Sequence, residues 1–289
     1  MVEGARLESV YTATYRGFES LPLCKLVVNF KKSSVFYFAE LFSLKPRLTL
    51  SKPFQFKEFT IHQDKTAMKV GTDGVLLGAW SSVENYPDTI LDIGAGTGVI
   101  SLMLAQRCDA MTIDAVELDE NAYEQTVQNF ENSDWGDRLY GYNASFQEFA
   151  NEIAEENETY DLIVSNPPFY TDDFETEDTA RNKARFTSAL SFDNLLEGVL
   201  KILGENGVFA TIIPYKEEAD FIKLAEKNNL FLHRVCHVRG TATTEVKRSL
   251  LEFSLHSKEQ LTTELTIEIS RHQYTQEYIN LTKDFYLKM

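Results

Sequence analysis

The sequence predicts an α/β protein built around a mostly parallel β-sheet. From Thr89 onward, apolar runs typical of strands alternate with stretches typical of helices, the pattern of successive βαβ units. A glycine-rich turn follows the first of these strands, and a later apolar run ends in Asn-Pro-Pro-Phe. Because open α/β sheets bind ligands at the carboxyl ends of their strands, the last two features also predict where a site lies.

The individual elements follow from the positions of the apolar runs. Strands are predicted near residues 89–94, 112–118, 138–143, 160–166, 207–214, 230–238 and 248–256. Helices are predicted near residues 97–107, 119–132, 145–155, 191–203 and 216–228. The polar loop 240–247 is long enough to join the last two strands as an antiparallel hairpin. We therefore expect a seven-stranded, mostly parallel sheet with an antiparallel edge strand, followed by a strand at 264–269 and a helix from Thr275.

The stretch from Tyr160 to Tyr170 carries the clearest chemistry. An apolar run delivers Asn166 and Pro167 to the carboxyl end of its strand, with Phe169 just beyond. The amide oxygen of Asn166 and the carbonyl of Pro167 can accept the N–H bonds of an exocyclic amine, and Phe169 can stack on its ring. Two such acceptors favour a pyramidal geometry at the amine nitrogen, in which its lone pair can act as a nucleophile. A simple strand-ending turn is the alternative, because Asn and Pro are common turn residues.

The glycine turn indicates a second ligand-binding feature. Gly94, Gly96 and Gly98 are spaced G-x-G-x-G, so the third glycine is one residue early for a dinucleotide fingerprint, and no Walker lysine follows. The turn therefore disfavours NAD and nucleoside triphosphates and suits a ligand without phosphates. Asp92 can fix the turn or meet an ammonium group. Glu117, which lies 19 residues after Gly98, can accept two ribose hydroxyls or stand as a solvated charge.

These three features together resemble class I S-adenosylmethionine (SAM)-dependent methyltransferases. The glycine turn looks like the cofactor loop, Glu117 like the ribose ligand, and Asn166-Pro167-Pro168-Phe169 like the N-P-P-[YF] motif of amino-group methyltransferases. A narrower similarity is to the bacterial tRNA1(Val) (adenine(37)-N6)-methyltransferase family, and it extends from residue 52 to the end. It rests on residues 54–57, 67–80, 184–186 and 284–289.

The resemblance implies a Rossmann-like class I methyltransferase fold, SAM as cofactor, S-adenosyl-L-homocysteine (SAH) as product, tRNA as partner and a cytoplasmic location. It implies that Asn166, Pro167 and Phe169 are catalytic. Cofactor contacts are expected from Asp92, Gly94, Gly96, Gly98, Glu117, Ser145 and Asn166. Substrate contacts are expected from Pro168, Tyr170, Arg185 and Lys69.

Ser145 departs from the family pattern. The family usually places an Asp there, facing the amino group of the cofactor's adenine, whereas this chain reads Asn-Ala-Ser at 143–145. A hydroxyl can still accept one hydrogen bond, but it carries no charge. The resemblance therefore implies weaker binding of SAM at this point.

Composition excludes several other classes of protein. The 289 residues are 43% hydrophobic, enough for one large domain with a substantial core. Three scattered cysteines (Cys24, Cys108 and Cys236) fit reduced cytosolic thiols and argue against zinc or a disulfide framework, and the five histidines show no ligand spacing, so no metal is expected. No apolar stretch reaches the roughly 18 residues that span a bilayer.

The net charge of the chain does not favour binding to RNA. The 28 basic and 44 acidic residues give 28 − 44 = −16, whereas RNA affinity depends largely on Lys and Arg. Local basic patches must then supply the contacts: Lys52, Lys57, Lys65 and Lys69; Arg181, Lys183 and Arg185; Arg239, Lys247 and Arg248. Arg185 is the first candidate, because it lies past the catalytic turn in the polar loop 171–187 that we expect over the substrate pocket.

Domain boundaries follow the charge and the resemblance. Residues 1–51 carry seven basic and four acidic residues and do not resemble the family, so we expect an extension, or a natural start near Ser51. The remaining divisions are an upstream segment (52–88), a methyltransferase core (89–258) and a C-terminal strand and helix (259–289).

Two other functions fit the same motifs. N-P-P-[YF] enzymes also methylate a glutamine of release factors and guanine N2 of ribosomal RNA, and an acidic chain suits a protein substrate. Release-factor enzymes, however, usually carry an N-terminal helical domain for which residues 1–51 are too short. A non-enzymatic scaffold that binds a partner is supported only by Ser145. Methylation assays with labelled SAM on tRNA beside release factor separate these functions.

Overall fold

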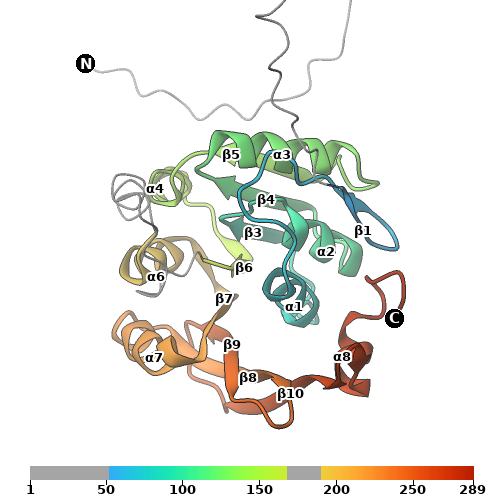
Figure 1. The fold of residues 1–289 in the computed structure, drawn as a ribbon. Coiled ribbons are helices and arrows are strands. Elements are labelled where there is room, and N and C mark those ends of the chain that lie inside the picture. Colours follow the sequence, from blue (N-terminus) through green and yellow to red (C-terminus); the bar gives the residue numbers. More distant parts are fainter. Residues whose placement is uncertain (1–51, 168–189) are drawn as a thin grey trace, which may run out of the picture. The chain divides into compact units, whose positions relative to one another are not determined.

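The fold is organised by a nine-stranded mixed sheet (Figure 1). A computed structural model of the chain describes residues 52–167 and 190–289, and Lys52–Met289 form one compact unit. Five neighbouring strands are parallel: β5 (Leu139–Asn143), β4 (Thr112–Glu117), β3 (Thr89–Ile93), β6 (Tyr160–Ser165) and β7 (Leu203–Pro214). Beyond β7 the sheet continues with β9 (Val246–Ser254), β8 (Phe231–Thr241), β10 (Leu261–Ser270) and β11 (Gln273–Tyr274).

All seven predicted strands form, and the predicted fold class is confirmed. The position of the antiparallel strand was wrong, however. Strand β9 lies inside the sheet, antiparallel to β7 on one side and to β8 on the other. The outer side of β8 is covered in turn by β10, which runs parallel to it and pairs Leu265 with Val238. Both of these side chains are buried, so the C-terminal residues extend the core as well as the sheet.

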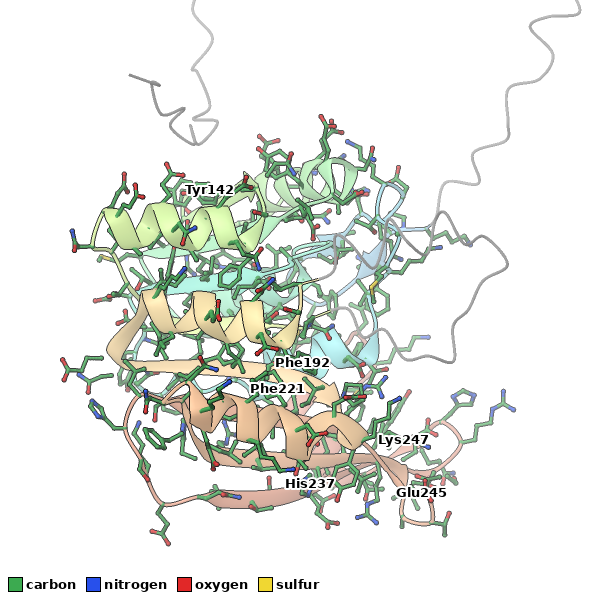
Figure 2. The ribbon with its side chains drawn as sticks, turned by 90° about the vertical axis from the view of Figure 1, so that its left-hand side faces the viewer. Tyr142, Phe192, Phe221, His237, Glu245 and Lys247 are labelled. Carbon is green, nitrogen blue, oxygen red and sulfur yellow. The ribbon has the colours of Figure 1, made fainter. Side chains whose placement is uncertain are left out.

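Helices cover both faces of the sheet (Figure 1). One face carries α1 (Thr72–Trp80), α2 (Val99–Arg107), α3 (Glu120–Glu131) and α8 (Gln276–Thr282). The other carries α4 (Phe146–Glu155), α6 (Phe192–Ile202) and α7 (Glu218–Lys227). Figure 2 looks onto this second face, where Phe192 of α6 meets Phe221 of α7 edge-on with ring centroids 4.8 Å apart. None of the helices in the described part of the chain is long and apolar enough to cross a membrane.

The sequence did not predict the elements of the upstream segment, β1 (Phe54–Gln55), β2 (Thr60–Ile61) and α1. Seven of the nine residues of α1 are buried, so the helix lacks the alternation of apolar and polar faces by which helices are recognised. Close packing against α2 explains its glycines. A Cβ at Gly78 would lie only 2.9 Å from the sulfur of Met103.

Charged side chains fix the carboxyl end of α1. Arg107 donates to the carbonyl of Gly78 in the last turn of α1 at 2.9 Å and to that of Ser81 just after the helix at 2.7 Å. The guanidinium of Arg234 lies 4.0 Å from the centroid of the Trp80 ring. The fully buried carboxylate of Glu252 accepts from the backbone and hydroxyl of Ser82 at 2.7 and 2.9 Å and from Arg234 at 3.3 Å. A buried carboxylate is tolerated only with such partners, so this network holds α1 in one position against β8 and β9.

A second buried carboxyl group lies within β4. Asp114 is 7% exposed, and its Oδ2 accepts a hydrogen bond of 2.6 Å from the hydroxyl of Tyr160 in β6. Burial raises the pKa of Asp114 from its ordinary value of 3.8 to about 6, against the opposing effect of this hydrogen bond. Between about pH 4 and pH 6, the folded protein therefore keeps a proton on Asp114 that the unfolded chain releases.

We predict that Asp114→Asn changes how the free energy of unfolding depends on pH. Between pH 4 and pH 6 the unfolded wild-type chain ionises Asp114 while the folded protein keeps the proton, so the wild type loses up to about 3 kcal/mol as pH rises. The amide of the variant does not titrate. In urea unfolding, the stability of the variant relative to the wild type should rise from pH 4 to pH 6 and then level off. A difference that stays constant over this range would contradict the buried, protonated state.

Candidate active site

Strand pairing gathers the predicted site residues at the carboxyl edge of the sheet. Ile93 at the end of β3 pairs with Ser165 of β6 on one side and with Val116 of β4 on the other. The next residue along each strand is Gly94, Asn166 or Glu117, respectively. The glycine turn, the amide and the carboxylate therefore lie on adjacent strands at the same level.

The three glycines of the turn have different roles. All have left-handed backbones, with φ of 72° at Gly94, 60° at Gly96 and 75° at Gly98. A Cβ at Gly94 would meet no atom within 4 Å, and one at Gly96 only a backbone oxygen at 4.0 Å. A Cβ at Gly98 would lie 2.7 Å from the ring of Phe130. Gly94 and Gly96 thus leave room for a ligand over the turn, whereas Gly98 allows α3 to pack beneath it.

Asp92 supports the turn from within the sheet. The residue is fully buried, and its Oδ2 accepts from the backbone N–H of Ser101 at 3.2 Å and from the Ser101 hydroxyl at 2.7 Å, near the start of α2. Burial raises the pKa of Asp92 to about 7, although the bonds to Ser101 oppose this. Among the described residues its Oδ1 has no hydrogen-bond partner. Of the two roles expected for Asp92, this geometry favours fixing the turn.

Glu117 reaches from β4 to the glycine turn. Its Oε2 accepts from the backbone N–H of Gly96 at 2.9 Å, and its Oε1 from that of Asp119 at 2.9 Å. Asn143 of β5 donates to the carbonyl of Glu117 at 2.9 Å and so holds this strand end. The carboxylate remains partly exposed, and the neighbouring Leu118 is 51% exposed. An acceptor thus lies at the turn, and an exposed apolar residue follows it in the sequence.

Asn166 and Pro167 complete the described part of the predicted catalytic motif. Asn166 is half-buried and Pro167 is buried. The hydroxyl of Ser165, one residue earlier, donates to the carbonyl of Ile93 at 3.1 Å and ties β6 to β3 just below the site. Lys69 is exposed on the upstream segment. The other predicted residues, Pro168, Phe169, Tyr170 and Arg185, lie outside the described residues.

Ser145 caps a helix. Its hydroxyl accepts from the backbone N–H of Glu148 at 3.3 Å, and its own backbone N–H donates to the Glu148 carboxylate at 3.3 Å, the reciprocal arrangement of a capping box at the start of α4. The hydroxyl also donates to this carboxylate at 2.6 Å. The donor and one lone pair of the hydroxyl are therefore used within the helix. One lone pair remains to accept from an adenine amino group, so the expected contact with the cofactor stays a prediction.

Sequence reasoning missed a buried polar face of α3, formed by Gln125, Thr126 and Asn129. All three residues are at most 1% exposed. Their side chains bind the glycine turn and residues 62–65 of the upstream segment. The spacing i, i+1 and i+4 marks one helix face, but polar residues on a helix face ordinarily indicate contact with water. Only the partners in the folded protein distinguish the two cases.

The doubly wound sheet, the left-handed glycine turn, and the acid and amide at adjacent strand ends define a class I SAM-dependent methyltransferase. A family model for the methyltransferase small domain matches residues 75–191. A relative from Christiangramia forsetii is 55% identical over 239 residues, which cover 83% of this chain and 99% of the relative. One from Bacteroides fragilis is 44% identical over 241 residues, covering 83% and 100%. Both relatives are named tRNA1(Val) (adenine(37)-N6)-methyltransferase, and this chain belongs to that family.

Solved structures agree on the fold. The chain superposes on the crystal structure of a predicted O-methyltransferase from Agrobacterium tumefaciens with a TM-score of 0.58 at 16% identity, covering 74% of this chain and 96% of that one. A methyltransferase subunit of a type I restriction-modification system from Streptococcus thermophilus gives a TM-score of 0.52 at 16% identity, covering 74% and 52%. At these identities the likeness establishes the fold alone.

We predict that alanine has unequal effects at two glycines of the turn. Gly96→Ala places a Cβ in open space, so its cost is the left-handed backbone, about 1–2 kcal/mol. Gly98→Ala incurs the same strain and also drives a Cβ into Phe130, which adds about 1–3 kcal/mol. Urea unfolding should show the larger loss of stability for Gly98→Ala. Equal losses would mean that α3 does not pack on the turn as described.

Proposed function

We propose that this protein transfers the methyl group of SAM to N6 of an adenine in tRNA, and that the target is adenine 37 of tRNA1(Val). The observation that carries the proposal is the pairing of Ser165 with Ile93, which sets Asn166 beside the glycine turn. The names of relatives that are 44–56% identical over more than four-fifths of the chain support the substrate.

The residues around the turn suit SAM. The open space over Gly94 and Gly96 forms a cradle that side chains would fill, and the partly exposed carboxylate of Glu117 stands beside it as an acceptor for ribose hydroxyls. Leu118 offers an apolar surface to an adenine ring. When bound, SAM supplies an electrophilic methyl group. The task of the protein is then mainly to align the attacking nitrogen with that group.

Asn166 and Pro167 are the proposed holders of that nitrogen. The side-chain oxygen of Asn166 and the carbonyl of Pro167 would accept the two N–H bonds of the adenine amino group and direct its lone pair toward the cofactor side of the pocket. Phe169 would stack on the base. The base must leave its stack to reach such a pocket, and an anticodon loop makes this step inexpensive because its bases are already unpaired.

Methyl transfer to defined substrates tests the proposal. The purified protein is incubated with labelled SAM and, separately, with tRNA1(Val) transcript, the same transcript with guanine at position 37, and a release factor. We expect label only in the unaltered transcript, recovered as N6-methyladenosine. Label in the release factor would indicate glutamine methylation instead. Equal labelling of the two transcripts would rule out adenine 37 as the target.

We predict that Asn166→Ala lowers the rate of methyl transfer by about 10²–10³, as expected when a contact made mainly in the transition state is lost. Binding of SAM, measured by calorimetry, should change little. Asn280→Ala, on the exposed surface of α8, is the matched control and should retain wild-type turnover. Near-normal turnover in Asn166→Ala would remove Asn166 from the catalytic centre.

We predict that Glu117→Ala weakens SAM affinity by about 1.5–3 kcal/mol, the range for a lost charged hydrogen bond. Affinity for tRNA should stay close to that of the wild type. Glu120→Ala removes an exposed carboxylate three residues later and serves as the control. Calorimetry that finds unchanged SAM affinity in Glu117→Ala would show that this carboxylate does not bind the ribose.

A further inference from the structure

The buried polar face of α3 joins two parts of the site that are far apart in the sequence. Toward the glycine turn, the hydroxyl of Thr126 donates to the carbonyl of Gly96 at 2.9 Å, and the amide nitrogen of Asn129 donates to the carbonyl of Thr97 at 2.8 Å. Both acceptors belong to the turn itself. The backbone of the cofactor turn is therefore attached to α3 by side chains as well as by the packing of Gly98.

The same face holds the start of a loop of the upstream segment. The side-chain oxygen of Asn129 accepts from the backbone N–H of His62 at 2.8 Å, and its nitrogen donates to the His62 carbonyl at 2.9 Å. One turn earlier on the helix, the side-chain oxygen of Gln125 accepts from the N–H groups of Asp64 and Lys65 at 2.9 and 3.0 Å. Among the three residues of this face, Asn129 is the one that bonds to both the loop and the turn.

The loop that begins at His62 is closed on itself. The side-chain oxygen of Gln63 accepts from the backbone N–H of Val70 at 3.0 Å, so residues 63–70 leave and return at nearly the same point. Near the end of the loop, Met68 is 67% exposed and Lys69 is also exposed. The chain then enters α1, where Gly74 faces Val99 at the start of α2. An apolar and a cationic side chain are thus presented close to the edge of the sheet that carries the glycine turn.

Asn129 makes the positions of the turn and the loop depend on each other. Its amide is 1% exposed and makes three hydrogen bonds, so moving either partner would leave a polar group buried without a bond. That penalty is large compared with the net value of an ordinary hydrogen bond. A ligand that fixes the turn therefore also fixes His62 and the base of the loop.

We propose that Asn129 is a positioning residue that couples binding of the cofactor to binding of RNA. The inference rests on the proposed function, in which SAM lies on the glycine turn, and on the expected substrate contact of Lys69, by which the 63–70 loop would meet the RNA backbone. Occupation of the turn favours the loop position that binds RNA, and by thermodynamic reciprocity RNA strengthens cofactor binding by the same factor.

Three variants of the full-length protein separate the two attachments. Thr126→Val removes a bond to the turn, and Asn129→Ala removes bonds to both the turn and His62. Gln125→Met removes the bonds to residues 64–65 and one bond to Gln128 on the same helix, but none to the turn. Asn121→Ala, on the exposed side of α3, is the control. SAH affinity is measured by calorimetry. The affinity for tRNA1(Val) transcript is measured with and without saturating SAH, and the ratio of the two values is the coupling factor.

We expect Thr126→Val to weaken SAH binding about 2–10-fold, the range for one neutral hydrogen bond. RNA binding without SAH should stay unchanged. Gln125→Met should weaken RNA binding without SAH and leave SAH affinity unchanged. Asn129→Ala should weaken both and reduce the coupling factor to about one, whereas Asn121→Ala keeps the wild-type factor. Thermal unfolding confirms that each variant is folded. If Asn129→Ala does not fold, Asn129→Ser replaces it with the same expectation.

Two results would overturn the inference. One is an Asn129 variant that keeps the wild-type coupling factor, because a merely structural loss would lower the affinity for RNA equally with and without SAH. The other is a wild type that binds both ligands with a coupling factor of one. A wild type that binds SAH but no tRNA would instead overturn the proposed function, and the inference with it.

Discussion

The pairing of β3 with β6 is the constraint on which the site depends. Parallel strands with matched ends bring the residues that follow them to one level, and here these are Gly94 and Asn166. The hydroxyl of Ser165, which bonds to the carbonyl of Ile93, fixes this register from the side chain as well. A shift of one residue would reverse the side of the sheet that each side chain faces. The glycine turn and the amide would then no longer lie together.

Below this edge, buried polar groups hold the turn from two directions. Asp92 supports it from the strand, through Ser101 of α2, and Asn129 supports it from α3. Each buried polar side chain would be costly without partners, so each is stable in only a narrow range of positions. The turn needs such support because left-handed glycines have little preference of their own for one conformation. Rigidity of the cradle thus comes from its neighbours.

The sequence predicted well the strands of the sheet and the residues that follow their carboxyl ends, because both depend on local patterns. Apolar runs mark buried parallel strands, and glycine spacing marks a turn whatever surrounds it. What it missed depends on contacts between distant residues. Helix α1 is buried nearly all round and has no polar face to reveal it. The place of β9 was wrong because the sequence of a hairpin does not state which of its two strands pairs with the rest of the sheet, and here β9 inserts between β7 and β8.

Polar residues show the same limit within the site. Asn129 is a polar residue of the kind that usually faces solvent on a helix, and only the fold reveals that its amide bonds to three backbone groups. Ser145 shows the converse. Its capping box with Glu148 is visible in the sequence as Ser-x-x-Glu before a helix, but the resemblance to the family directed attention to the missing Asp instead. One residue can thus cap a helix and also lie where the family contacts its cofactor.

Charge places a further limit on how RNA is bound. Several basic side chains named from the sequence are paired with carboxylates, including Lys65 with Glu124, Arg239 with Glu264 and Arg248 with Asp73. With −16 overall, the chain has few cations to spare for phosphates. Recognition must then depend mainly on shape and on contacts with unpaired bases, which an anticodon loop supplies and a duplex does not.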